Sequence, residues 1–553
     1  MSSAPEIPLT LPDILARASE TCGNCGLIFV DEDERRFTWT EIEAQAQRVA
    51  AGFQNLDGKP GDRVAIVCQG LRPLVTSFFG AVLAGLYPSI LPTPINRRRL
   101  QGYLAHIGSI VRVAEPRFVV VDEDVELVGE PLMKEAGLEG TACAVRHDEL
   151  IAASGRFDPY KPNPDEIAII QFTSGSTSSP RGVVLPHRCI VANVQAIVER
   201  LEVAPGDVGG GWLPMYHDMG LIGNLLGATA RSIDLVLTTP FNFLRRPRRW
   251  LDVMERHNVS ITAGPNVSYR HLLERGEPLG RDLGSWRVAI IGAEPVDAEL
   301  LAAFTETFGR VGFPRSGFMP AYGLAEVGLM VTGVRAQEEY QTVDVDREAL
   351  EGEGIARPPS DGSNRVRIVS CGVPVRETSV RIVDEHGEQV ADGRIGEISI
   401  AGSSVMREYF NDSEATAETL RDGWLMTGDL GYTQDEQLFV TGRKKELIIF
   451  DGRNYYPQDI ERAVHGLELV RPGSVVAFGT SNGRSEGVVV VAAPRNPQHT
   501  EGIDERVRAV VSETLNLPVL DVILLESGRI PRTTSGKLCR GRCRDLYEEG
   551  KLA

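Results

Sequence analysis

The stretch best suited to ligand chemistry is rich in glycine and hydroxyl side chains and follows an apolar, strand-like run. Eight of the twelve residues from 171 to 182 are Gly, Ser or Thr. Glycine lets the backbone turn tightly and approach a ligand, and hydroxyls with backbone N–H groups form a cradle of donors for phosphate oxygens. The spacing matches neither the GxxxxGK[ST] loop nor the GxGxxG loop. Residues 171–182 therefore predict either a phosphate-binding loop of another kind or a flexible surface turn.

Four other stretches combine charged, aromatic and glycine residues in ways that could serve chemistry: 212–220, 321–326, 424–429 and 530–537. The first contains His217 and Asp218, but adjacent residues on one strand or helix point in different directions, so a metal chelate is not favoured. The second places an aromatic residue and a carboxylate four positions apart, which is one turn of a helix. The last two end in Asp429 and Lys537. Each stretch alone is more typical of a structural element than of a site.

The elements that would position these residues follow an alternating pattern. Short Val/Ile-rich runs bounded by turn residues alternate with amphipathic, helix-like segments, for example at 63–68, 117–122, 166–171 and 286–292. Such runs suit strands that are buried on both faces, as in a parallel sheet covered by helices. The bulk of the chain is therefore expected to be α/β.

The pattern changes near residue 340, where residues 340–359 are acidic and interrupt the alternation. From 365 to 440 the strand-like runs are short and separated by glycine turns, which indicates hairpin-rich β structure. After Gly442 come 553 − 442 = 111 residues of mixed pattern, enough for a small domain. We expect a large domain over residues 1–442, a small one over 443–553, and a joint near Lys445.

Composition and charge exclude several classes of protein. Of the 553 residues, 42% are hydrophobic and 24% charged, which leaves enough apolar surface for several cores and gives no signature of disorder. The net charge of −18 argues against nucleic acid as the main ligand. The most apolar stretch, residues 77–92, is shorter than the roughly 20 residues that a membrane helix needs. We expect a soluble protein with no integral membrane segment.

The eight cysteines are scattered, which is typical of a protein from a reducing compartment. Cys22 and Cys25 have the spacing of a zinc knuckle, but no second pair follows at a matching interval, so ordinary buried or surface thiols are favoured. The first residues show no basic segment followed by an apolar one, so no signal peptide is expected. These observations predict a cytoplasmic protein.

Taken together and in this order, the five stretches resemble the adenylate-forming superfamily of acyl-CoA synthetases, nonribosomal-peptide adenylation domains and luciferases. The resemblance runs from about residue 11 to residue 547. Within the superfamily the sequence looks like a fatty acyl-AMP ligase. This likeness is carried by residues 213–221, 241–251, 322–326 and 452–461, and by an insertion-like segment at about 340–371.

The resemblance implies an architecture and a reaction. The α/β fold would have two sheet–helix subdomains and a small β-rich subdomain, followed by a small mobile α+β domain. The family joins a carboxylate to ATP with release of pyrophosphate, then passes the acyl group to a thiol. The implied substrate is a fatty acid, and the implied cofactors are ATP and Mg²⁺. Because both reactants are anions, catalysis must come mainly from positioning and from cations aimed at the developing charge.

The resemblance also implies which residues meet the phosphates. The β- and γ-phosphates would be held by the loop residues Thr173, Ser174, Gly175, Ser176 and Thr177. Glu326 would bind Mg²⁺ with help from Thr177, since magnesium prefers oxygen ligands. Lys537 would bridge the substrate carboxylate and the α-phosphate, where a compact ammonium fits better than the planar guanidinium of arginine.

Further residues would bind the nucleoside. By the same resemblance, Tyr322 would stack on adenine beside Gly292, Ala293, Glu294, Ala321 and Gly323. Asp429, aided by Arg443, would accept hydrogen bonds from the ribose hydroxyls. His217 would line the junction between the nucleotide and the acyl chain.

The sequence departs from the family pattern at two places. Arg181 stands where many relatives have lysine before the last glycine of the phosphate loop, and activity is expected to survive because the positive charge is kept. The hinge contains Lys444, Lys445 and Glu446 in place of an acid pair, with Lys445 as the expected pivot between two domain orientations.

The resemblance implies that the acceptor is the phosphopantetheine thiol of an acyl carrier protein, and this carrier is expected to be separate because only 553 − 537 = 16 residues follow Lys537. Carrier proteins are generally acidic. From 529 to 553 seven basic residues stand against three acidic ones, a local charge of +4 that could steer such a partner, and residues 245–249 form a second candidate patch. Ordinary solvated helix faces explain both patches equally well.

Three other functions share these motifs. An acyl-CoA synthetase would carry out the same first half-reaction but use CoA as acceptor. A luciferase-like oxygenase would consume oxygen. A catalytically silent nucleotide-binding scaffold is less favoured, because every catalytic position that can be matched, including Lys537 and Glu326, is present.

Overall fold

The computed structural model describes residues 8–31, 34–94, 100–173, 180–360, 365–451, 453–481, 486–532 and 538–552. The predicted phosphate-loop residues Ser174, Gly175, Ser176 and Thr177, and the predicted catalytic Lys537, lie outside these ranges. In the described part of the chain, no helix is both long and apolar enough to cross a membrane.

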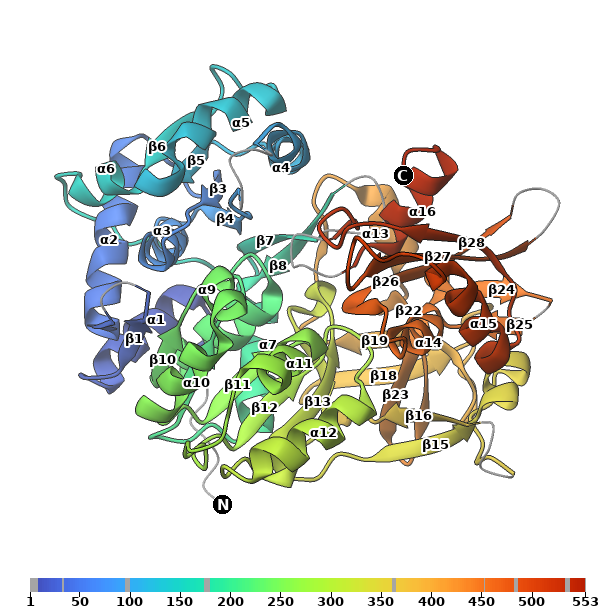
Figure 1. Cartoon of the computed structure of the whole chain (residues 1–553). Coiled ribbons are helices and arrows are strands. Elements are labelled where there is room, and N and C mark those ends of the chain that lie inside the picture. Colours follow the sequence, from blue (N-terminus) through green and yellow to red (C-terminus); the bar gives the residue numbers. More distant parts are fainter. Residues whose placement is uncertain are drawn as a thin grey trace.

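The largest sheet has nine strands and lies below the amino-terminal sheet in Figure 1. Its order is β17 (Val373–Pro374), β14 (Met330–Gly333), β13 (Phe318–Gly323), β12 (Val288–Ile291), β11 (Ile261–Gly264), β9 (Val208–Gly211), β10 (Asp234–Leu237), β1 (Gly26–Phe29) and β2 (Arg35–Thr38). The strands from β13 to β1 are parallel, and the outer strands are antiparallel. The apolar run at 286–292 becomes β12, so its predicted place in a parallel sheet is confirmed.

A second, fully parallel sheet comes from the amino-terminal part of the chain. It consists of β4 (Tyr87–Ile90), β3 (Arg63–Val67), β5 (Phe118–Val121) and β6 (Cys143–Arg146), so the runs at 63–68 and 117–122 are strands as predicted. The run at 166–171 was also expected in a parallel sheet, and this is wrong. It forms β7 (Ile167–Thr173), which pairs antiparallel with β8 (Arg181–Pro186), because the short glycine-rich connection returns the chain as a hairpin.

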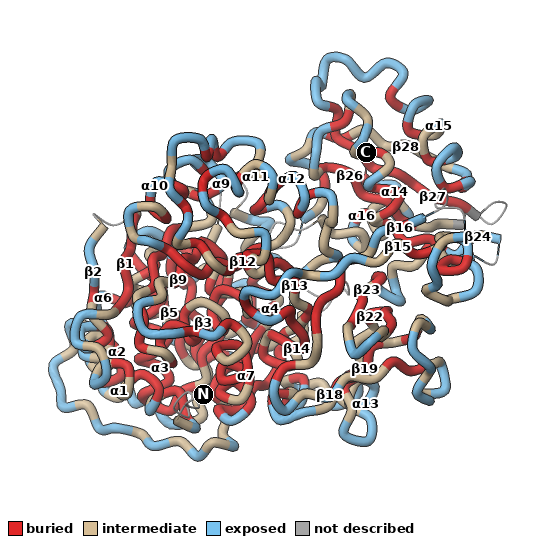
Figure 2. Tube along the Cα trace, turned by 90° about the horizontal axis from the view of Figure 1, so that it is seen from below, coloured by how far each residue is buried: buried red, intermediate tan, exposed pale blue. Residues whose placement is uncertain are grey.

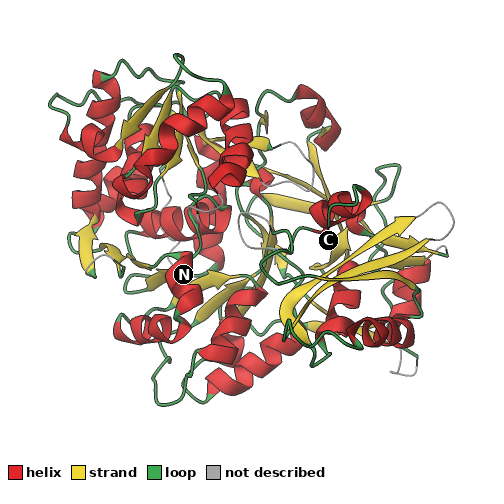
Figure 3. Cartoon of the chain, turned by 45° about the horizontal axis from the view of Figure 1, so that its top comes forward, coloured by secondary structure: helices red, strands yellow, loops and turns green. Residues whose placement is uncertain are grey.

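Helices cover both sheets (Figure 3). They are α1 (Leu11–Thr21), α2 (Trp39–Asn55), α3 (Leu71–Leu83), α4 (Leu100–Ala114), α5 (Gly129–Ala136), α6 (His147–Ala152), α7 (His187–Arg200), α8 (Gly227–Arg231), α9 (Pro240–Arg245), α10 (Pro247–Arg256), α11 (Asn266–Arg275) and α12 (Ala298–Gly309). One apolar cluster takes side chains from α2, α3 and α7 and from strands of both sheets. The two sheets therefore share a core, and Figure 2 shows strands and helices of this region as largely buried.

The β-rich subdomain is an antiparallel sheet of hairpins, as the glycine turns predicted. Its strands are β18 (Thr378–Val383), β19 (Gly396–Gly402), β22 (Trp424–Gln434), β21 (Leu420–Arg421) and β23 (Gln437–Arg443), with α13 (Ser413–Thr419) beside them. A further strand, β20 (Glu408–Tyr409), leaves this region and pairs with β8 of the glycine-rich hairpin. The α/β class is confirmed, with a β-rich addition.

The acidic segment near residue 340 forms a hairpin of its own. β15 (Thr342–Asp346) pairs antiparallel with β16 (Arg365–Val369), and a helical turn (Ala349–Glu353) follows β15. Val345, Leu350 and Val366 pack with Tyr456, which belongs to the segment after the hinge. The insertion-like segment therefore contacts the carboxyl-terminal part of the chain.

The carboxyl-terminal elements have apolar clusters of their own. They are a helical turn (Lys444–Glu446), β24 (Ile448–Phe450), β25 (Arg453–Tyr455), α14 (Pro457–His465), β26 (Val470–Ser481), β27 (Glu486–Pro494), α15 (Ile503–Leu515), β28 (Val519–Leu524) and α16 (Arg540–Glu548). Strands β26, β27 and β28 form one sheet, and helices α14, α15 and α16 pack on it.

Two cysteines differ from the expectation. Cys22 ends α1 and Cys25 precedes β1, and the two residues between them bring the Cα atoms to 5.4 Å, where the sulfurs form a disulfide. The prediction of two free thiols at these positions is wrong, because the local turn, which the spacing alone does not specify, closes the pair. The other six cysteines are free.

One buried ion cluster ties α16 to the hinge and to α14. Arg540 donates two hydrogen bonds of 2.7 Å to the carboxylate of Glu461 and one of 2.6 Å to Glu446. Although burial alone would lower the pKa of Arg540, the two carboxylates hold it above its ordinary value.

Replacing Arg540 with alanine is expected to destabilise the carboxyl-terminal domain by about 3 kcal/mol, because the buried Glu461 and the half-buried Glu446 lose their cation. Urea denaturation, combined with hydrogen exchange of α14 and α16, measures the effect. Arg542→Ala is the matched control, since Arg542 lies exposed on the same helix. Equal stability of the two variants would contradict a stabilising role for the Arg540 cluster.

Candidate active site

Two neighbouring parallel strands bring the predicted nucleotide-contact residues together. Gly292, Ala293 and Glu294 follow β12, and Ala321, Tyr322 and Gly323 end β13, its neighbour in the sheet. A Cβ atom on Gly292 would lie 2.5 Å from the Ala321 carbonyl oxygen, so this close approach of the two backbones requires glycine. Ligands of open α/β sheets bind outside the carboxyl ends of the strands, which is where these residues lie.

A buried carboxylate joins this edge to the β-rich subdomain. The Tyr322 hydroxyl donates a 2.8 Å hydrogen bond to Oδ2 of Asp429, and Nε of Arg443 donates a 2.8 Å bond to Oδ1. Asp429 and Arg443 are cross-strand partners on β22 and β23. Tyr322, which was predicted as an adenine contact, therefore forms one hydrogen-bonded group with Asp429 and Arg443, which were predicted together as ribose contacts.

Electrostatics at this group balance burial against charge. Burial raises the pKa of the Asp429 carboxyl above its ordinary value, and the Arg443 guanidinium and the Tyr322 hydroxyl oppose that change. In return, Asp429 raises the pKa of Arg443. The side chain of Arg443 is 55% exposed and that of Asp429 only 7%, so the arginine remains open to a ligand.

Glu326 lies on the helical turn (Ala325–Val327) after β13 and has a partner that the sequence did not reveal. The Tyr409 hydroxyl donates a 2.7 Å hydrogen bond to its Oε1. The guanidinium of Arg181 lies 5.2 Å from the centre of the Tyr409 ring. Strand β20, which carries Tyr409, thus connects Glu326 to the hairpin that bears the glycine-rich loop. No motif in the sequence marks Tyr409.

The same hairpin also positions the segment of His217. Thr173 ends β7 opposite Arg181, at the base of the loop. Two residues earlier, the Gln171 side chain donates a 2.6 Å hydrogen bond to the carbonyl of Tyr216. His217 follows directly, with its Nδ1 atom 3.6 Å from Oδ1 of Asp218. Gln171 therefore ties the segment of His217 to the hairpin of β7 and β8.

The described residues include no cluster of three or more His, Cys, Asp or Glu side chains that could hold a metal by themselves. In the part of the chain that the structure describes, His217 and Asp218 have no third His, Cys, Asp or Glu side chain beside them with which to hold a metal. Glu326 is half-buried, burial raises the pKa of its carboxyl, and the bond from Tyr409 opposes that rise. A single carboxylate such as that of Glu326 fits Mg²⁺, which can complete its shell with phosphate oxygens and water.

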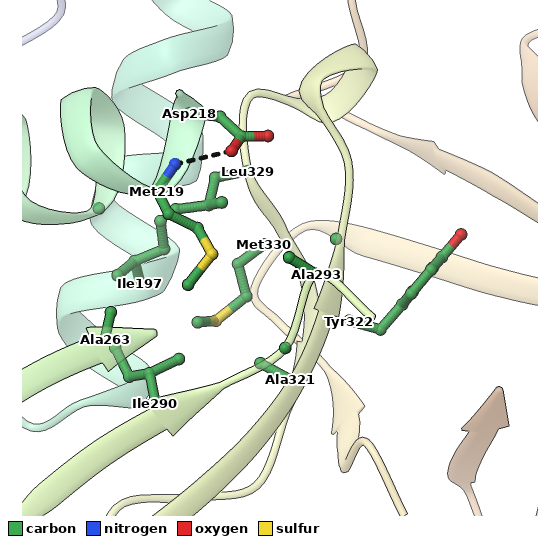
Figure 4. A pocket seen from close by; sticks show the side chains of 13 residues that line it. Ile197, Asp218, Met219, Ala263, Ile290, Ala293, Ala321, Tyr322, Leu329 and Met330 are labelled. Atoms are coloured by element: carbon green, nitrogen blue, oxygen red, sulfur yellow. Dashed lines mark hydrogen bonds between the residues drawn. The ribbon is translucent and has the colours of Figure 1, made fainter. Parts of the chain in front are cut away.

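An apolar pocket opens beside the nucleotide-contact residues (Figure 4). Its lining residues come from two helical segments, four strands and adjoining loops: Ile197, Asp218, Met219, Gly223, Ala263, Ile290, Gly292, Ala293, Ala321, Tyr322, Gly323, Leu329 and Met330. The side chains of Ile197, Met219, Leu329 and Met330 gather on one side, and Tyr322 extends away from them. The sequence analysis missed the apolar half, because its members are single core-type residues scattered over 134 positions, from 197 to 330.

The hinge shows how its charged residues divide between the two domains. Lys444 donates to Oε2 of Glu397 on β19, at 3.1 Å, whereas Glu446 binds Arg540 on α16. Lys445 therefore lies between Lys444, which is bonded to the large domain, and Glu446, which is bonded to the small one. Neither partner, Glu397 or Arg540, was predicted.

The arrangement combines two kinds of environment. One side offers hydrogen-bonding groups for a base, hydroxyls and phosphates, and the other offers apolar side chains. A ligand that fits both has an apolar chain joined to a nucleotide.

Comparison with known proteins agrees with this geometry. The family described as AMP-binding enzyme matches residues 16–410. The chain is 32% identical, over 571 aligned residues, to the long-chain-fatty-acid–AMP ligase FadD32 of Mycolicibacterium smegmatis, covering 94% of this chain and 90% of that protein. It is also 32% identical to the medium-chain-fatty-acid–[acyl-carrier-protein] ligase JamA of Moorena producens, covering 94% and 91%.

Solved structures show the same likeness. A structure from a study of fatty acyl-adenylate ligases of E. coli and L. pneumophila superposes with a TM-score of 0.92 at 32% identity, covering 98% of each chain. A fatty acyl-adenylate ligase of L. pneumophila, in complex with acyl adenylate and pyrophosphate, superposes with a TM-score of 0.76 at 28% identity, covering 98% and 96%. The chain therefore belongs to the AMP-binding, adenylate-forming enzymes and resembles the fatty acyl-AMP ligases among them.

Proposed function

We propose that this protein activates a fatty acid with ATP and transfers the acyl group to the phosphopantetheine thiol of a separate acyl carrier protein. In the first step a carboxylate oxygen attacks the α-phosphorus of ATP, forming acyl-AMP and releasing pyrophosphate. In the second step the thiol sulfur attacks the acyl carbon and AMP leaves. The observation that carries the proposal is the apolar pocket at the carboxyl ends of β12 and β13. An acyl chain in this pocket would lie next to a nucleotide bound at the strand ends.

The residues of the site would divide the work of the first step. Tyr322 would stack on adenine, and Asp429, paired with Arg443, would accept hydrogen bonds from the ribose. The glycine-rich loop would hold the phosphates, and Lys537 would bring the carboxylate and the α-phosphate together. Mg²⁺, held by Glu326 and Thr177, would supply charge neutralisation at the phosphates.

The hinge would allow the second step. We propose that the part of the chain after Lys445 rotates once acyl-AMP has formed, which would remove Lys537 and open a path for the thiol. The support is the division of charges at the hinge, where Lys444 and Glu446 are anchored on opposite sides. A rotation at Lys445 would leave both anchors intact.

An acyl-CoA synthetase remains the alternative, because its first step is the same. Two observations favour the carrier protein: JamA is described as an acyl-carrier-protein ligase, and the insertion-like segment at β15 and β16 contacts the carboxyl-terminal domain.

The acceptor is tested by incubating the purified protein with ATP, Mg²⁺ and lauric acid, together with CoA or with a holo acyl carrier protein. We expect the carrier protein to become acylated and CoA to remain free, as mass spectrometry would show. Strong acyl-CoA formation with no acyl-carrier product would contradict the proposed acceptor.

Lys537→Ala is expected to slow pyrophosphate release by at least about 100-fold, because a positioned cation in a partly dry site stabilises developing negative charge. Circular dichroism and thermal unfolding should be unchanged. Lys551→Ala is the control, since Lys551 is an exposed lysine of the same domain, paired only with nearby Glu549. An unchanged rate in Lys537→Ala would refute its assigned role.

Asp429→Asn is expected to raise the KM for ATP about 30-fold. This corresponds to the roughly 2 kcal/mol that a hydrogen bond to a charged group contributes. Asp435→Asn, in the exposed turn between β22 and β23, serves as the control. Steady-state kinetics with varied ATP separates the two variants, and equal KM values would exclude Asp429 from the nucleotide site.

A further inference from the structure

Helices α9 and α11 carry an unusual group of exposed apolar side chains. Eight large apolar residues are exposed among those that the structure describes, and four of them fall within residues 240–281. Three form a group on α9 and the first turn of α11: Phe241 is 61% exposed, Leu244 45% and Val267 49%. His271, one turn after Val267, lies with its Nε2 atom 2.7 Å from the Leu244 carbonyl, which brings the two helices together.

The same surface is basic in an acidic protein. Residues 240–281 contain eight arginines against four acidic residues, a net charge of +4, whereas the whole chain has −18. Arg248 and Arg270 are paired, with Glu277 at 2.8 Å and Asp297 at 2.7 Å. Among the described residues, no ion pair involves Arg245, Arg246 or Arg275. Phe241, Leu244, Val267, Arg245 and Arg246 are called here the basic apolar face.

This face rests directly on the segments that line the pocket. The ring of Phe243 on α9 stacks on Trp212 with centroids 4.1 Å apart, and Trp212 begins the stretch that continues to His217 and Asp218. Asn266, the first residue of α11, donates a 2.8 Å hydrogen bond to the carbonyl of Pro295, in the loop that starts at Gly292. A partner on the face would lie close to the site.

The face also adjoins the domain that is proposed to rotate. Figure 2 shows α9, α10, α11 and α12 along one edge of the large domain, with the carboxyl-terminal domain beyond α12.

The other candidate surface, near the carboxyl terminus, is less basic than its sequence suggested. Arg540 is neutralised by Glu461 and Glu446, and Arg532 donates to the Gly473 carbonyl. Part of the positive charge of residues 529–553 is therefore paired within the domain and is not presented to a partner.

We propose that the basic apolar face is the docking surface for the acyl carrier protein, an inference that rests on the proposed function. Carrier proteins are acidic, so the exposed arginines would attract the carrier, and Phe241, Leu244 and Val267 would pack against its apolar residues. A small acidic protein touches only this face. An anionic membrane is an extended plane and would also meet the acidic surfaces of a chain with net charge −18.

The test measures acyl transfer to three thiols by the unmodified enzyme, by a double variant of the face and by a control double variant. Arg245→Glu/Arg246→Glu places two negative charges on the face, and Arg48→Glu/Arg156→Glu makes the same change at two exposed arginines of the amino-terminal part. Pyrophosphate release from ATP and lauric acid measures the first step. Acyl transfer is measured with a holo acyl carrier protein, with free pantetheine and with CoA.

We expect Arg245→Glu/Arg246→Glu to lower kcat/KM for the carrier protein at least tenfold, while pyrophosphate release and transfer to pantetheine stay within twofold of the unmodified enzyme. Raising the salt concentration should slow the unmodified enzyme with the carrier and affect the variant less. The control pair should behave like the unmodified enzyme. Phe241→Ser, compared with Leu127→Ser at another exposed position, tests the apolar part in the same way.

The outcomes separate the two proposals. If the unmodified enzyme acylates the carrier and Arg245→Glu/Arg246→Glu does so equally well, the docking surface is wrong and the proposed function stands. If the unmodified enzyme forms acyl-AMP but acylates no carrier, the proposed acceptor fails and the docking surface fails with it. If the variant loses only binding to phosphatidylglycerol vesicles, with carrier transfer unchanged, the face serves a membrane and the proposal is overturned.

Discussion

A carboxylate inside a protein must be hydrogen-bonded and compensated, and Asp429 meets this requirement only where two sheets come together. Its oxygens accept one hydrogen bond from Tyr322 of the nine-stranded sheet and one from Arg443 of the β-rich sheet. Neither sheet alone could bury this carboxylate without a large cost in free energy. The contact therefore fixes the β-rich subdomain against the edge of β12 and β13, and the nucleotide-contact residues acquire their geometry from it.

The hinge depends on the same carboxylate. Arg443 is the last residue of β23, so the anchor of Asp429 is also the point at which the chain leaves the large domain. The next three residues form the joint, with Lys444 held by Glu397 and Glu446 held by Arg540. Any movement of the carboxyl-terminal domain that begins after Lys444 leaves the nucleotide contacts in place. A ligand bound at Asp429 could then persist through a change of domain orientation.

A second junction connects the phosphate side to the acyl side. The glycine-rich hairpin is tied to Glu326 through Tyr409 and to the His217 segment through Gln171. The pocket lies beyond these contacts and is walled by α7, β11, β12 and the turn that follows Asp218. The polar and apolar sides of the site thus adjoin each other, and their residues come from more than one subdomain.

Much of this could be predicted from the residues. Apolar runs with turn residues between them identified β3, β5 and β12, and the motif order identified the family to which the chain belongs. These features are local, since a strand pattern, a glycine turn or a motif is complete within about ten residues. The antiparallel pairing of β7 was missed because strand direction depends on the partner, and the disulfide of Cys22 and Cys25 was missed because spacing does not specify the turn.

The tertiary structure decided what depends on residues far apart in the chain. Tyr409 lies 83 positions from Glu326, Arg540 lies 94 from Glu446, and the apolar lining of the pocket comes from separate helices and strands. No periodicity or motif encodes such pairs, because burial and hydrogen-bond satisfaction are met by the whole packed chain rather than by its segments. The sequence alone determined the chemistry that is available, the family likeness and the α/β class. Only the folded chain decided which carboxylates are compensated, where the apolar pocket meets the nucleotide edge, and which basic surface stays exposed.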